Sequence, residues 1–129
     1  MPTGRPGTMT DPTEPPDLAS TPNVIPYVDP HDGPRRLLTI DISTHIFHAG
    51  AYIPFAGIDG RQYVVSWGAV SFEVPADRNV HVSVHLQSNG GAGYTPSPFA
   101  SIILYPNPLP QRLATQFARA GMGALVPLP

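Results

Sequence analysis

Two histidines, His81 and His85, are the residues whose type and spacing come closest to a metal site. They lie in the alternating segment 80–86, so on a β-strand both imidazoles point to the same face. Their Cα atoms would be about 13 Å apart, whereas each zinc ligand must place its nitrogen about 2 Å from the metal. Completing a site would also need a third ligand, from His45 or His48. The alternative is a polar row above a valine core, so we expect no metal and no other cofactor.

Other catalytic arrangements have little support. There is no cysteine, which excludes thiolate chemistry and disulfides, and no Gly-x-Ser-x-Gly turn for a serine nucleophile. The glycines at 90, 91 and 93 are followed by no lysine, which argues against a phosphate-binding loop. A carboxylate pair for glycoside hydrolysis could draw on only four acids after residue 34, namely Asp41, Asp59, Glu73 and Asp77. We therefore predict a protein that is not an enzyme, with a histidine-based metal-binding or hydrolytic protein as an alternative.

Aromatic residues suggest a contact surface. Tyr52, Phe55 and Tyr94 lie in irregular segments, and we predict that they are exposed and form an interaction surface. Trp67 shares its strand face with Tyr63. A lone tryptophan in an alternating strand packs inward more often than it forms a sugar-stacking platform, so we assign Trp67 to the core.

Low charge indicates association. Only 12% of residues are charged, and no formal charge occurs between Asn79 and Gln111. Such surfaces favour self-association or partner contact, and the chain has no lysine to protect its strand edges. The net charge of −2, without a basic cluster, argues against nucleic acid. The expected partner is a second copy or another protein, with peripheral envelope contact possible. The predicted function is an interaction module, and the alternative is a structural subunit of a larger particle.

The elements that carry these residues are short strands. Alternation with a period of two begins at Leu37 and is clearest over residues 80–86. Asp59-Gly60 is a typical hairpin turn, and further strands are expected at residues 69–74 and 99–105. Residues 45–57 fit a strand or a packed loop, and residues 111–120 fit a strand or a helix. This pattern predicts an all-β fold, an antiparallel β-sandwich or small barrel of about 6–8 strands.

The composition changes near residue 34. Residues 1–34 hold nine of the eighteen prolines and five of the nine acids. We predict a disordered, acidic, Pro-rich tail over residues 1–34, within which residues 24–28 could dock as an extended segment. The β domain follows over residues 35–125, with a C-terminal tail over 126–129. Met9 is an alternative start. Neither a transmembrane segment nor a signal peptide is visible, so we expect a cytoplasmic protein.

An ordered series of motifs gives the chain a family resemblance. The series comprises Thr39 to Ile42, an apolar segment with Phe47, Tyr52 and Phe55, the turn at Ile58-Asp59-Gly60, Trp67-Gly68, Val74-Pro75, Val80-His-Val-Ser-Val84, and a last strand pair over residues 100–104 and 113–117. In this order, over residues 37–125, the chain resembles small, poorly characterised actinobacterial β domains. The resemblance favours a strand over residues 111–118 and implies no catalytic residues. Such domains usually carry Pro-Pro-Gly where this chain has Pro75-Ala76-Asp77, so the turn there lacks the expected glycine.

Overall fold

The computed structural model describes residues 23–43, 52–88, 98–117 and 123–129. Within these ranges the chain forms nine strands and no helix, so it contains no helix that could cross a membrane. The strands are β1 (Val24–Ile25), β2 (Arg35–Ile42), β3 (Tyr52–Ile58), β4 (Arg61–Val64), β5 (Gly68–Pro75), β6 (Val80–Ser88), β7 (Phe99–Leu104), β8 (Gln111–Phe117) and β9 (Gly123–Leu128).

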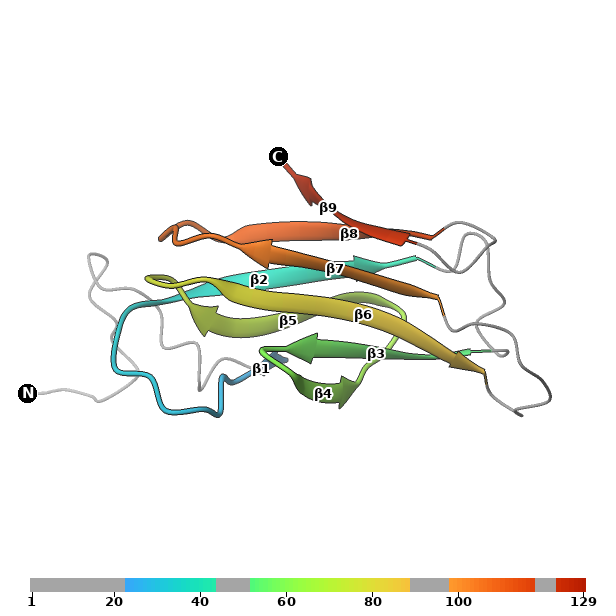
Figure 1. Ribbon diagram of the computed structural model, residues 1–129, viewed down its shortest axis with the longest axis horizontal. Coiled ribbons are helices and arrows are strands. Elements are labelled where there is room, and N and C mark those ends of the chain that lie inside the picture. The colour runs from blue at the N-terminus through green and yellow to red at the C-terminus, as the bar shows by residue number, and fades with distance from the viewer. Residues whose placement is uncertain (1–22, 44–51, 89–97, 118–122) are drawn as a thin grey trace, which may run out of the picture.

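The strands form two sheets, which confirms the predicted all-β sandwich. One sheet has the order β1-β5-β2-β8-β9 and the other the order β4-β3-β6-β7. Figure 1 shows most strands running along the long axis of the molecule. The four-stranded sheet is antiparallel throughout, as expected. In the five-stranded sheet, however, β1 pairs with β5 and β2 pairs with β8 in parallel, because these strands are joined by long connections rather than hairpins.

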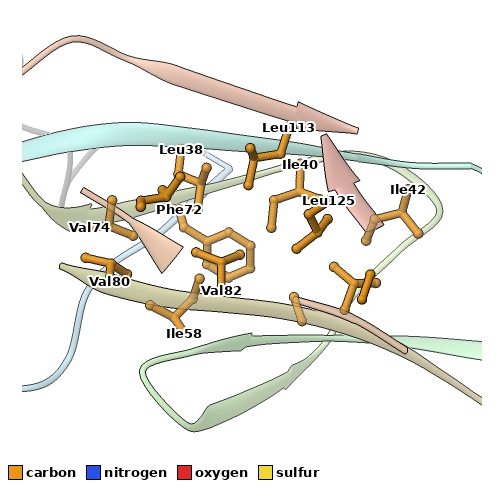
Figure 2. Close-up of a cluster of buried hydrophobic side chains, with 14 of the residues drawn as sticks. Leu38, Ile40, Ile42, Ile58, Phe72, Val74, Val80, Val82, Leu113 and Leu125 are labelled. Atoms are coloured by element: carbon orange, nitrogen blue, oxygen red, sulfur yellow. The ribbon is translucent and has the colours of Figure 1, made fainter. Parts of the chain in front are cut away.

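The core lies between the two sheets and follows the alternation of the strands. Figure 2 shows side chains of the two sheets pointing toward one another, with the Phe72 ring in the middle. The fully buried side chains of the five-stranded sheet include Leu38, Ile40, Phe72, Val74 and Leu113, and those of the four-stranded sheet include Val80, Val82, Val84 and Leu86. All four residues of the valine row 80–86 that were predicted to face inward do so.

The β3–β4 hairpin forms at the predicted turn. Ile58 pairs with Arg61, which leaves Asp59 and Gly60 as the two loop residues. Both have positive φ, 49° and 87°, as a type I′ turn requires. The turn after Val74 needs no such residue, since positive φ among the described non-glycine residues occurs only at Asn23 and Asp59. The glycine missing relative to the family pattern is therefore not required there.

More of the segment before residue 34 belongs to the folded domain than its composition predicts. Val24 and Ile25 add β1 to the edge of β5, and Tyr27 is only 8% exposed and part of the core. The Tyr27 hydroxyl donates to Asp59 Oδ2 at 2.8 Å and accepts from Arg78. The tail therefore cannot extend to residue 34; the docking foreseen for residues 24–28 occurs, because Tyr27 fills the end of the sandwich. Residues 1–22 lie outside the described part.

The C-terminal region also differs from the expected boundaries. Residues 111–117 form a strand, as the family resemblance favours, and not a helix. The segment 126–129, expected to be a tail, instead continues β9 to Leu128, which pairs with Arg112. Leu125 anchors this strand because its side chain is buried in the core. The only proline within β9, Pro127, is accommodated because β9 is an edge strand.

Candidate functional site

The two histidines of the expected polar row lie on the outer face of the four-stranded sheet, in different surroundings. His81 is exposed, and its backbone N–H donates to Asp59 Oδ1 at 2.8 Å. His85 is half-buried and stacks on Phe55, with 4.9 Å between ring centroids and 7° between the ring planes. Among the described residues no group of three metal-ligating side chains occurs. His45 and His48, the possible third ligands, lie outside the described residues.

Large side chains form a row across the outer face of this sheet. Strand register aligns Val64 of β4, Phe55 of β3, His85 of β6 and Phe99 of β7. Val64 is 68% exposed and Phe99 is 49% exposed. We call these four residues the aromatic row. The sequence places Phe55 in the predicted interaction surface, and the structure adds Val64 and Phe99 beside it.

A row of small residues lies next to the aromatic row. Gly57, Ser83 and Ser101 are aligned across β3, β6 and β7, two residues further along each strand. The side chains of Ser83 and Gln62 close over Gly57: a Cβ built on this glycine would lie 2.4 Å from Ser83 Oγ and 2.7 Å from Gln62 Nε2. A methyl group at position 57 would therefore displace both side chains. We call Gly57, Ser83 and Ser101 the small row.

His81 and Ile103 form a second ridge beyond the small row, since they are direct partners on β6 and β7. Ile103 is 50% exposed. The outer face therefore alternates ridge, low row and ridge along the strands. Between the two ridges the described residues carry no formally charged side chain; Asp59 lies in the hairpin turn at the border.

Burial also sets the ionisation of the stacked histidine. The partly apolar surroundings of His85 lower its pKa below the ordinary value, because burial penalises the charged imidazolium. Neutral imidazole stacked on Phe55 adds to the apolar character of the aromatic row. The aromatic row is therefore uncharged at neutral pH.

The four acidic residues after residue 34, by contrast, all form ion pairs or hydrogen bonds that give them a structural role. Asp41 pairs with Arg112, Glu73 with Arg35, and Asp77 with His31. Asp59 accepts hydrogen bonds from the Tyr27 hydroxyl and from the His81 backbone. These pairings hold loops and neighbouring strands together and bring no two of these carboxylates to a shared site.

The remaining aromatic predictions have mixed outcomes. Tyr52 is half-buried and packs against the core, so its side chain is not part of the outer face. Tyr94 lies outside the described residues. Trp67 packs against the core together with Tyr63, although it is only partly buried. Val64 and Phe99 were missed because each ends or begins an irregular stretch. The available signal was strand alternation, since each neighbours an inward-facing residue, the partly buried Tyr63 and the buried Ala100.

The chain is a two-sheet β-sandwich, and the outer face of its four-stranded sheet carries no formally charged side chain between the two ridges among the described residues. Comparison with protein-family models, curated proteins and solved structures gave no match. The actinobacterial resemblance remains an expectation based on the motifs quoted above.

Proposed function

We propose that this protein is a non-enzymatic interaction module that associates with a second copy of itself through the outer face of the four-stranded sheet. The observation that carries the proposal is the pattern of rows on that face. The aromatic row and the small row are two residues apart on β3, β6 and β7, which corresponds to about 7 Å, and Gln62 takes the same register position on β4.

A two-fold axis makes these rows complementary. If the axis runs across the strands midway between the two rows, the aromatic row of one copy lies over the small row of the other, and the reverse contact forms at the same time. Such an isologous contact uses one self-complementary patch on both copies. The lack of formal charge between the ridges means that apposing two identical faces brings no like charges together.

The size of the face sets the expected affinity. Four strands about 4.8 Å apart, each contributing about six residues, give a footprint of about 19 Å by 20 Å. Stable interfaces bury about 800 Å² on each partner. The projected area of this face is about 400 Å², without the extra surface of protruding side chains, and is therefore smaller. We therefore expect a dimer with a dissociation constant in the micromolar range, about −8 kcal/mol or weaker.

Sedimentation velocity across a hundredfold range of concentration tests the proposal. The wild-type protein should shift from monomer to dimer. Phe99→Glu should weaken this association at least about tenfold, since it places a charge in the contact, and it should fold normally because Phe99 is half-exposed. The matched control is Gln116→Glu, which adds the same charge at an exposed position of β8 in the other sheet.

Two results would contradict the proposal. One is a wild-type protein that stays monomeric over the whole range, and the other is association that Phe99→Glu and Gln116→Glu affect equally. Closed particles of many copies would favour the structural-subunit alternative, because one isologous contact closes at the dimer and a shell needs a second contact.

A further inference from the structure

A buried arginine, Arg36, lies at the base of a groove that shares Ile103 with the second ridge of the outer face. Arg36 faces the same side of β2 as the inward-facing Leu38, Ile40 and Ile42, and it is only 4% exposed. Its Nη2 donates to the Tyr105 carbonyl at 3.1 Å and its Nη1 to the Leu109 carbonyl at 3.5 Å. Its Nε is buried without a hydrogen-bond partner.

The charge of Arg36 lacks a counterion within the described residues. The other described arginines have partners: Arg35 pairs with Glu73, Arg61 with Asp29 and Arg112 with Asp41, and Arg78 lies over the Tyr27 ring. A guanidinium has five N–H donors; two carbonyl contacts are present here, and the buried Nε–H has no acceptor among the described residues. Burial alone lowers the pKa of Arg36 below its ordinary value. An uncompensated buried cation is costly unless an anion completes its contacts.

Fixing the loop after β7 does not account for this arginine. The loop has hydrogen bonds of its own: Asn107 N–H donates to the Ala76 carbonyl at 2.9 Å, and Asn107 Oδ1 accepts from Leu109 N–H at 2.8 Å. Replacing a buried ion by an apolar side chain of similar volume is often neutral or stabilising. A charge retained at such a place is a functional-site candidate.

The groove beside Arg36 has the size and lining of a small-ligand site. Its volume is about 640 Å³, within the range of roughly 300–1,000 Å³ usual for ligand pockets. Its lining comes from the end of the edge strand β7 and the loop after it, from Arg36 on β2 and Gln111 at the start of β8, and from Pro127 near the end of the other edge strand, β9. Ile102, Ile103, Pro106 and Pro127 provide apolar walls, and Gln111 adds an amide.

We propose that this groove binds an apolar carboxylic acid, with the carboxylate on Arg36 and the apolar chain between β7 and β9. Arginine is suited to a carboxylate because its planar fork donates two parallel hydrogen bonds. The apolar walls favour a hydrocarbon tail over a second polar group. The same chemistry is offered by a free acid and by the C-terminus of an apolar peptide.

Titration calorimetry with octanoate and with 1-octanol, which has the same chain without the charge, tests the proposal. Wild-type protein should bind octanoate about tenfold or more tightly than octanol, the ratio expected for a hydrogen bond to a charged group. Arg36→Met should bind both equally, and Arg112→Met, which removes a surface arginine, should behave as wild type. An apolar hexapeptide with a free or an amidated C-terminus distinguishes the two sources: tighter binding of the free peptide than of octanoate identifies a chain end, and the reverse identifies a free acid.

A second variant keeps the test independent of any effect of Arg36→Met on folding. Gln111→Glu replaces the side-chain amide of a groove residue by a carboxylate. This carboxylate competes with an added acid for Arg36 and repels the acid's own carboxylate. Octanoate binding should then fall to the level of octanol while the protein remains folded. Equal affinity of the wild type for octanoate and octanol, no octanoate binding, or unchanged octanoate affinity in both Arg36→Met and Gln111→Glu would overturn the proposal.

Discussion

Tyr27 tests whether the segment before residue 34 is part of the folding unit. Its side chain is 8% exposed and closes one end of the sandwich. A buried tyrosine removes about 200 Å² from water, worth about 5 kcal/mol at about 25 cal/mol per Å² as an upper bound. Truncation of comparable aromatic residues to alanine costs about 3–5 kcal/mol. We therefore expect Tyr27→Ala to remove about half of a total stability of about 5–10 kcal/mol.

Tyr27→Phe separates the ring from the hydroxyl. The hydroxyl contacts Asp59 and Arg78, and Asp59 keeps its contact with the His81 backbone in the variant. The loss should therefore be about 1 kcal/mol, a fall in Tm of about 4–8 °C. Urea unfolding followed by Trp67 fluorescence measures both variants.

Two deletions complete this test. Removing residues 1–22 should leave Tm within a few degrees. Removing residues 1–34 should cost at least as much as Tyr27→Ala, because it also removes β1 and the His31 contact with Asp77. Equal stability of the two deletion variants would refute the reasoning and return the domain boundary to residue 34.

Three further predictions concern the turn, the tryptophan and the dimer face. Gly60→Ala should destabilise by about 1 kcal/mol, because φ at this residue is 87° and alanine is strained there; urea unfolding checks this. Trp67→Ala should cost about 2 kcal/mol, less than the roughly 3–5 kcal/mol of a fully buried aromatic residue, because Trp67 is only partly buried; thermal unfolding measures it. Dimerisation should weaken as pH falls below the ordinary histidine value of about 6.5. Burial already lowers the pKa of His85 in the monomer and a dimer buries it further, so the monomer takes up the proton first. His81, which is exposed, and Asp59 at the border are the neighbouring titratable groups, and sedimentation of His85→Gln between pH 5 and 8 should show no such dependence if His85 is responsible.

Local patterns in the sequence predicted the local parts of this fold. The alternation over residues 80–86 directly encodes which side chains are buried, because successive residues of a strand face opposite sides. Asp59-Gly60 encodes its own turn through the backbone conformations that these residues tolerate. The parallel pairing of β2 with β8 has no such local signal, since it depends on how a long connection crosses the molecule.

Average composition is a poor guide to structure where a few apolar residues outweigh their surroundings. Residues 1–34 are rich in proline and acids as a whole, yet Tyr27 in the core, Ile25 packed against it and the pairing of β1 with β5 hold residues 24–27 on the domain. The same averaging hid β9, a short edge strand that contains a proline and is anchored by Leu125.

Arg36 shows that the strand period can predict burial even for a residue type that is usually exposed. The pair Arg35-Arg36 resembles the polar flank of a strand, which fits Arg35 and its partner Glu73. Extending the alternation back from Ile42, Ile40 and Leu38, however, places Arg36 on the buried face. The strand period predicts a core position here, and a charged residue at a core position lowers local stability. Such conflicts concentrate at functional sites. The strand period thus identifies the position, and the absence of a described carboxylate partner makes it a candidate ligand site.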